Sequence, residues 1–172
     1  MKAFPQTSHF VGLNRPIGEE YDIDGLSVEG VIPADVDGVF FRAVPDPAFA
    51  PKFDDDNVLS GDGMISAVRL QGGKASTSMR FVQTARHKAE VEMGRARFGR
   101  YRNPFTDDAD VQGIDRTVAN TTPVWHAGRL LMTKEDGRPY RIDPKTLETL
   151  GSYDFGGKLK SETVTAHVRI DP

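Results

Sequence analysis

The chain has 172 residues, of which 38% are hydrophobic, and this is enough for one domain with a buried core. Its net charge of -3 and the scattered positions of its Lys and Arg residues argue against a nucleic-acid-binding protein. The absence of cysteine excludes disulfides, thiolate catalysis and thiolate metal sites, which leaves His and carboxylate side chains as candidate metal ligands.

The predicted elements begin with an N-terminal arm, residues 1–25. Residues 1–16 lack the apolar core of a secretion signal, and no stretch of the chain approaches the roughly 20 apolar residues of a membrane span. A cytoplasmic protein is therefore expected. Gly38–Arg42 then predicts a buried core strand, which lies after the turn-like Pro33–Asp35 and before the breaker Pro45–Pro47.

A hairpin is predicted next, from Met64–Leu70 and Ala75–Gln83, because the two glycines between them favour a tight turn. From His87 to Asp115 the strand pattern breaks off, and Arg residues alternate with Gly and aromatic residues. We expect a long loop at 87–115, and long loops on rigid scaffolds tend to be functional. The chain contains no segment with the pattern of an amphipathic helix.

Four further short strands follow, separated by turns, and they predict a meander: Pro123–His126, Arg129–Lys134, Tyr140–Asp143 and Leu147–Phe155. Four-stranded meanders that repeat every ~40–50 residues are the unit of a β-propeller. We therefore expect an all-β fold in which residues 26–172 supply at most roughly three to four blades.

The segment Thr163–Asp171 is rich in β-branched residues and contains His167. This pattern predicts a strand that presents one imidazole to a central metal site. A single isolated His is more often a core or surface residue, and one imidazole does not make a metal centre. We therefore expect the chain to be a piece of an enzyme rather than a complete one.

Several segments, in this order along the chain, resemble the carotenoid cleavage oxygenase family, and most closely its lignostilbene dioxygenase branch, which cleaves stilbenes. The resemblance extends from about Phe10 to Pro172 and covers only the N-terminal part of a family member. It rests on the following segments: Gly30–Arg42, Gly61–Ile65, Ala119–Thr121, Lys134–Tyr140, Leu147–Gly151 and Thr165–His167.

The resemblance implies a seven-bladed β-propeller with Fe(II) on its axis, held by four His residues from widely spaced strands. His167 would be the first of these ligands, and the remainder of the same polypeptide would carry the other three. A truncated relative without activity is the alternative. Glu135 would hydrogen-bond to one of the other ligands and orient it, and the alternative is a solvent-facing acid in the turn Glu135–Gly137. No role is assigned to His9, His87 or His126, which match no ligand motif.

Lys134 and Tyr101 fall where the stilbene-cleaving branch has a Lys and a Tyr that contact the 4-hydroxyl group of the substrate. A phenol has a pKa of about 10, and an ammonium group beside its oxygen favours the phenolate. The phenolate pushes electron density into the conjugated alkene and makes it nucleophilic toward O₂. An exposed Lys at a strand end and an amphipathic Tyr in a charged loop are the alternative interpretations.

Three further residues lie at positions where relatives line the substrate site or differ from this chain. Leu59 stands where relatives can place an aromatic residue against the substrate ring, so packing is retained but stacking is lost. Phe105 is expected to line the same tunnel, although core packing explains it equally well. Ser66 replaces a His of many family members that is not an iron ligand.

The leading hypothesis is a non-haem iron dioxygenase that cleaves the central alkene of a 4-hydroxystilbene, of the lignostilbene or resveratrol type, with O₂ into two aromatic aldehydes. The first alternative is cleavage of a carotenoid or apocarotenoid, which has no phenol to pair with Lys134. The second is a propeller-like binding protein without iron or activity. A homodimer is compatible with a fold of this size, and no residue in the sequence points to one.

Overall fold

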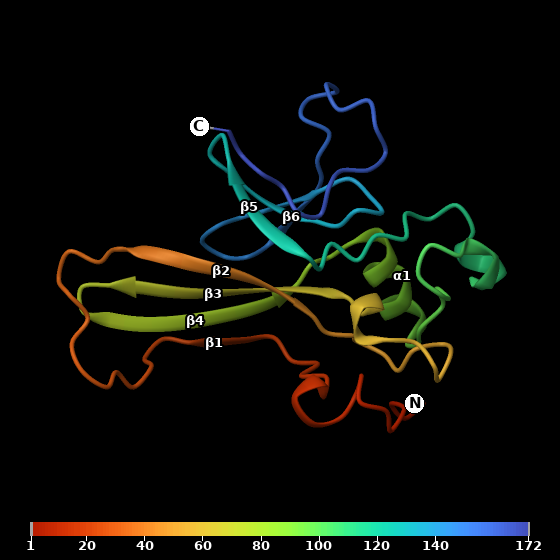
Figure 1. Ribbon diagram of the computed structural model, residues 1–172, viewed down its shortest axis with the longest axis horizontal. Helices are drawn as coiled ribbons and strands as arrows, with labels where there is room; N and C mark the ends of the chain where they lie inside the picture. The colour runs from red at the N-terminus through yellow and green to blue at the C-terminus, as the bar shows by residue number, and fades with distance from the viewer. Residues whose placement is uncertain (1, 172) are drawn as a thin grey trace.

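The computed structural model describes residues 2–171, in which the chain forms two four-stranded antiparallel sheets (Figure 1). The first sheet has the order β1-β4-β3-β2, and the second has the order β5-β6-β7-β8. Within these residues one α-helix, α1 (Ala85–Met93), lies between the two sheets in the sequence. The all-β class predicted from the short, Gly-punctuated apolar runs is therefore confirmed. No helix among residues 2–171 combines the length and the apolar character needed to cross a membrane.

The predicted hairpin is confirmed as β3 (Gly63–Gln71) and β4 (Lys74–Phe81), which pair along their whole length. Gly72 and Gly73 form the turn, with φ angles of 57° and 74°. Two successive residues with positive φ make the tight turn whose twist matches that of the strands, and glycine adopts this conformation without steric strain.

Strand β2 (Gly38–Pro45) is longer than predicted and is not a fully buried strand. Phe41 faces the second sheet, whereas its neighbour Phe40 is 67% exposed. Adjacent strand residues point to opposite faces, and a strand whose sheet is covered on one face alternates in burial. Pro45, predicted as a breaker, is the last residue of the strand and pairs with Gly63.

The predicted four-stranded meander is confirmed as the second sheet, whose strands are β5 (Thr122–His126), β6 (Arg129–Thr133), β7 (Tyr140–Ile142) and β8 (Thr149–Ser152). Ala127 and Gly128, with φ angles of 47° and 72°, make the tight turn between β5 and β6. Between β7 and β8 the register shifts at Arg141 and Ile142.

The main core lies between the two sheets, on the β2 side of the first sheet (Figure 1). It joins buried residues of β3 to buried residues of β6 and β7, and half-buried side chains of β2 pack against it: Ile65, Ala67, Leu130, Met132, Tyr140, Ile142, Val39, Phe41 and Ala43. Burial of this apolar surface fixes the orientation of one sheet on the other.

The segment predicted as a long loop at 87–115 begins within helix α1, so the prediction of a loop is wrong for residues 87–93. Thr84 caps the helix by accepting the N–H of His87 at 3.1 Å, and Gly94 ends it with a φ of 66°. The helix buries His87 and Glu90 while Val91 is 52% exposed. Its buried face is therefore polar, and a search for apolar periodicity does not detect it.

After α1 the chain continues as two short 3-10 helices, η3 (Pro104–Thr106) and η4 (Ala109–Val111), joined by irregular segments. No strand is described between Phe81 and Thr122. This connection is as long as a blade, which is why residues 2–171 contain two sheets and fewer than the upper estimate of three to four blades.

Part of the segment predicted as an N-terminal arm joins the first sheet as strand β1 (Tyr21–Ile23), which pairs with β4. The short 3-10 helix η1 (Gly12–Asn14) lies upstream of β1. After it, the backbone N–H groups of Ile17 and Gly18 donate to the carboxylate of Asp46 at 2.8 and 2.7 Å. These contacts tie the arm to Asp46, the residue that follows β2.

Candidate functional site

Lys134 directly follows β6 and is buried, with only 6% of its surface exposed. The prediction of a functional Lys competed with an exposed Lys at a strand end, and the burial rules out the exposed interpretation. Four consecutive buried residues of β6 precede Lys134, so the strand carries its side chain into the protein. A buried ammonium group without compensating contacts is unfavourable, so its partners are informative.

Tyr101 lies against Lys134, with the ammonium nitrogen 5.0 Å from the centroid of the phenol ring. The Tyr101 hydroxyl donates a hydrogen bond to the carboxylate of Glu135. Burial, this hydrogen bond and the negative charges of Asp136 and Glu135 raise the pKa of Tyr101 well above its usual value. Tyr101 is thus a neutral hydrogen-bond donor at physiological pH.

Leu59, in the short 3-10 helix η2 (Val58–Ser60), is another neighbour of Lys134. The Lys134 ammonium donates to the carbonyl oxygen of Leu59 at 3.4 Å. We call the four residues Leu59, Tyr101, Lys134 and Glu135 the lysine–tyrosine cluster. The structure thus brings together four of the predicted site residues, which come from three separate parts of the chain.

The Lys134 ammonium has few acceptors among residues 2–171. Its hydrogen bond to Leu59 is long, and its distance to Glu135 Oε1 is 4.0 Å, which is an ion pair without a hydrogen bond. An ammonium group carries three N–H donors. The cluster can therefore accept an additional oxygen, preferably an anionic one, beside Lys134.

Neighbouring groups lower the pKa of the Glu135 carboxyl. Burial raises the pKa of its carboxyl, but the hydrogen bond from Tyr101 and the positive charge of Lys134 act in the opposite direction and bring the pKa below its usual value. The carboxylate is therefore ionised and can accept a hydrogen bond from an imidazole N–H, as the predicted orienting role requires.

The turn after Glu135 packs tightly against the preceding segment, although the Glu135 side chain itself is 41% exposed. Asp136 accepts a hydrogen bond from the Thr117 hydroxyl at 2.8 Å, and burial raises the pKa of this carboxyl. A Cβ atom at Gly137 would lie 2.5 Å from Cβ of Thr117. This close approach requires glycine and fixes the direction in which Lys134 and Glu135 leave β6.

His167 does not lie on a strand, so the predicted strand at Thr163–Asp171 was wrong: no strand is described between Ser152 and residue 171. The Thr165 hydroxyl accepts the His167 backbone N–H at 3.3 Å, and such local bonds compete with sheet pairing. Thr133 donates to the carbonyl oxygen of Ala166 at 3.2 Å. This contact anchors the segment to β6, and the His167 side chain is exposed.

Phe105 and Ser66 lie outside the lysine–tyrosine cluster. Phe105, in η3, is 96% exposed, so the alternative that it serves core packing within residues 2–171 is wrong. Its role as a tunnel residue stays a prediction. Ser66 is half-buried in β3, between Arg42 of β2 and Met79 of β4, with which it is in register.

The backbone that carries Tyr101 is held by Asp107, whose side chain is 2% exposed. Its carboxylate accepts the N–H of Gly99 at 2.7 Å and two hydrogen bonds from the Arg116 guanidinium at 2.7 and 2.9 Å. Arg116 also donates to the carbonyl oxygen of Arg100 at 2.9 Å. Both residues preceding Tyr101 are thereby tied to one charge pair.

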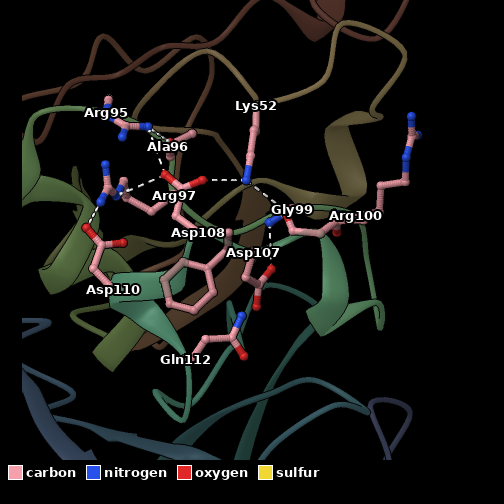
Figure 2. Close-up of polar contacts among 12 residues, drawn as sticks. Lys52, Arg95, Ala96, Arg97, Gly99, Arg100, Asp107, Asp108, Asp110 and Gln112 are labelled. Atoms are coloured by element: carbon pink, nitrogen blue, oxygen red, sulfur yellow. Dashed lines mark hydrogen bonds and ion pairs between the residues drawn. The ribbon is translucent and has the colours of Figure 1, made fainter.

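A second acidic residue of the same region, Asp108, forms ion pairs with several basic side chains. Figure 2 shows Lys52, Arg95 and Arg97 pointing toward its carboxylate. The hydrogen bond from Lys52 is the main cause of a pKa below the usual value for Asp108. These contacts account for Arg95 and Arg97, two of the Arg residues in the segment that the sequence predicted as a loop, because they hold this segment in shape.

His87, to which the sequence gave no role, belongs to a second buried polar group. Its ring stacks on Phe81 with centroids 4.8 Å apart, and Nδ1 lies 3.2 Å from the Asp62 carboxylate. Asp62 also accepts the N–H of Ala48 at 3.0 Å. The pair links α1 to the start of β3, and nothing in the local sequence pattern signals it.

Among residues 2–171, no group of three or more His, Cys, Asp or Glu side chains converges on a point where a cation would bind. His167 is exposed, and a metal bound to it would need further ligands from outside residues 2–171.

Comparison with known proteins gives similarity along almost the whole chain. The chain is 50% identical to resveratrol cleavage oxygenase 1 of Chaetomium globosum over 169 residues, 98% of the chain and 28% of that protein. It is 49% identical to lignostilbene-alpha,beta-dioxygenase isozyme III of Sphingomonas paucimobilis over 172 residues, 100% of the chain and 35% of that protein. Isoeugenol monooxygenase of Pseudomonas nitroreducens is 46% identical over 163 residues, 94% of the chain and 34% of that protein. The chain thus spans about a third of the length of these relatives.

Among solved structures, the lignostilbene dioxygenase of Pseudomonas brassicacearum superposes with a TM-score of 0.93 at 43% identity, over 97% of this chain and 35% of that one. It is a propeller enzyme, so the prediction that this chain folds as the N-terminal part of a β-propeller is confirmed. The profile of the family described as retinal pigment epithelial membrane protein matches residues 14–172. The chain therefore belongs to that family, the carotenoid oxygenases, as its sequence motifs indicated.

Proposed function

We propose that the full-length protein is a dioxygenase that cleaves the central alkene of 4-hydroxystilbenes into two aromatic aldehydes. The observation that carries the proposal is the buried Lys134 ammonium, which lies against Tyr101 and lacks a short hydrogen bond within residues 2–171. Resveratrol, lignostilbene and isoeugenol, which appear in the names of the relatives, share a phenol conjugated to an alkene.

Lys134 would bind the 4-oxygen of the substrate and favour its ionisation. An ammonium group within about 4–6 Å lowers the pKa of an acid by about 1–3 units, and burial strengthens the attraction. The resulting phenolate delocalises its charge through the ring to the alkene carbon. The alkene thereby gains the electron density that it needs to react with O₂.

Tyr101 would supply a second contact to the same oxygen. Its hydroxyl donates to Glu135 in this structure and retains its proton, because its pKa is raised. A phenolate beside Lys134 would compete with Glu135 for this hydrogen. Leu59 would pack against the ring of the substrate, where an aliphatic side chain offers contact without stacking.

His167 would hold Fe(II) together with three His residues from the remainder of the polypeptide, and Glu135 would accept the imidazole N–H of one of those three. Bound ferrous iron would activate O₂ for addition to the alkene. The overall reaction balances: one C=C bond and one O₂ molecule give two C=O groups. The contribution of residues 2–171 is to bind, ionise and orient the phenol.

The test is oxygen uptake by the full-length protein, reconstituted anaerobically with Fe(II), with 4-hydroxystilbene and with 4-methoxystilbene. We expect two aldehydes per O₂ from the hydroxylated substrate and at most weak turnover of the methyl ether, because an ether cannot ionise. Equal turnover of the two would refute the phenol proposal. Turnover of an apocarotenoid in preference to both would favour the carotenoid alternative, in which Lys134 has no anionic partner.

A further inference from the structure

Asn120 is a buried polar residue at the junction of the two sheets, two positions before β5, and only 5% of its surface is exposed. Its side-chain amide donates both hydrogens to one turn, to the carbonyl oxygens of Leu59 at 2.9 Å and Gly61 at 2.8 Å. Its own carbonyl oxygen accepts a hydrogen bond from the Thr121 hydroxyl at 3.1 Å. All three contacts are specific, and the donors of the amide are fully used.

One of these acceptors is shared with the lysine–tyrosine cluster. The Leu59 carbonyl oxygen that accepts from Asn120 is also the oxygen to which the Lys134 ammonium donates, at 3.4 Å. A carbonyl oxygen has two lone pairs and can accept both hydrogen bonds. The direction of this carbonyl, which sets the nearest protein acceptor of Lys134, is therefore fixed by Asn120.

The backbone just before Asn120 is held by contacts with the start of β3, so the position of the Asn120 side chain is fixed. The carbonyl oxygen of Val118 accepts the N–H of Gly63 at 2.9 Å, and a Cβ atom at Gly63 would lie 2.4 Å from that oxygen. Ala119 has a φ of 47°, which is unusual for a residue with a side chain. The segment before β5 is thus locked to the start of β3, and the Leu59–Gly61 turn is held against it.

We infer that Asn120 is a positioning residue for phenol recognition, which acts by holding the Leu59 carbonyl and through it the Lys134 ammonium. The inference rests on the proposed function. Without the Asn120 amide, two buried carbonyl oxygens lose their donors, and the turn relaxes toward other partners. Lys134 then loses its fixed acceptor and no longer points reliably at the substrate oxygen.

The test uses the full-length protein under anaerobic conditions, with binding of 4-hydroxystilbene and unsubstituted stilbene measured by fluorescence. The absorption band of the bound phenolate is recorded at one fixed pH. For Asn120→Ala we expect the preference for the hydroxylated ligand to fall on the order of tenfold and the phenolate band to weaken. Asn14→Ala, which removes a single exposed amide contact to the Ser8 carbonyl in the arm, is the matched control and should change neither.

A double-mutant cycle separates positioning from other effects. In a Lys134→Met background, Asn120→Ala should change the preference by about twofold or less, because its effect passes through the ammonium. An equal effect in both backgrounds would overturn the inference. Asn120→Asp, which has the same shape, is measured if the Ala variant does not fold, and the inference also fails if neither variant keeps the circular dichroism of the parent.

The proposed function and this inference fail in different ways. If the parent protein shows no preference for the hydroxylated ligand, or keeps it with Lys134→Met, the phenol proposal is wrong. If the preference depends on Lys134 but survives Asn120→Ala, only the inference about Asn120 is wrong.

Discussion

The ion pair of Asp107 and Arg116, which holds the backbone before Tyr101, should contribute measurably to local stability. Asp107→Asn keeps the shape of the side chain but removes the negative charge that faces the Arg116 guanidinium, and the Arg116 side chain is only 19% exposed. Breaking a fully buried pair costs about 3–5 kcal/mol, and the partial exposure of Arg116 brings the expected loss to about 3 kcal/mol. The pair holds Gly99 and Arg100, so the loss should appear as local opening of segment 95–116.

Hydrogen–deuterium exchange of the full-length protein measures this opening segment by segment. A loss of about 3 kcal/mol corresponds to exchange that is on the order of a hundredfold faster in segment 95–116, with little change in β6. Asp110→Asn is the control, because the Asp110 side chain is 43% exposed and surface ion pairs contribute about 1 kcal/mol or less. Equal exchange in the Asp107 variant and the parent would refute this account of the loop.

Three further outcomes are expected. Lys134→Met should lower kcat/KM for a 4-hydroxystilbene by about 10-fold to 1000-fold and leave iron binding unchanged, as steady-state kinetics and metal analysis will measure. Gly63→Ala should destabilise the protein by about 3 kcal/mol in thermal unfolding, because its Cβ would lie 2.4 Å from the carbonyl oxygen of Val118, whereas Gly38→Ala, with open space around it, should be neutral. The carboxylate of Asp143 accepts backbone N–H groups of its own turn, and these hydrogen bonds lower its pKa. The stabilisation that they contribute is present above the unfolded-state pKa of about 3.9 and is lost as the pH falls through the lower folded-state pKa. Asp143→Asn should therefore flatten the acid side of a plot of the free energy of unfolding against pH.

Local chemistry explains which elements the sequence predicts. The turn at Gly72 and Gly73 depends on positive φ angles at adjacent residues, and the dipeptide itself carries that information. Helix α1 is different, because its buried residues include Glu90, which accepts the N–H groups of Arg97 and Phe98 at 2.7 and 3.0 Å. A helix stabilised by buried polar contacts to a later segment has no apolar stripe to detect.

The residues of the candidate site also include some that the sequence predicted and one, Asn120, that it did not. Lys134, Tyr101, Leu59 and Glu135 were predicted because the chain resembles a family in which these positions belong to the site, and the structure brings all four together. Asn120 lies in one of the motifs of this resemblance, yet its role depends on acceptors 59 and 61 residues away. Contacts at such separations are set by the packing of one sheet on the other and cannot be read from spacing in the sequence.

The lysine–tyrosine cluster also depends on the core between the sheets. Lys134 follows β6 of the second sheet, Leu59 lies between β2 and β3 of the first sheet, and Tyr101 lies in the connection between the two sheets. Buried Met132, two residues before Lys134, belongs to the core that also contains Ile65 of β3. Because the interior is close-packed, a change in the volume of this core shifts one sheet relative to the other. The distance between the Lys134 ammonium and the Leu59 carbonyl therefore follows from the same packing that stabilises the fold.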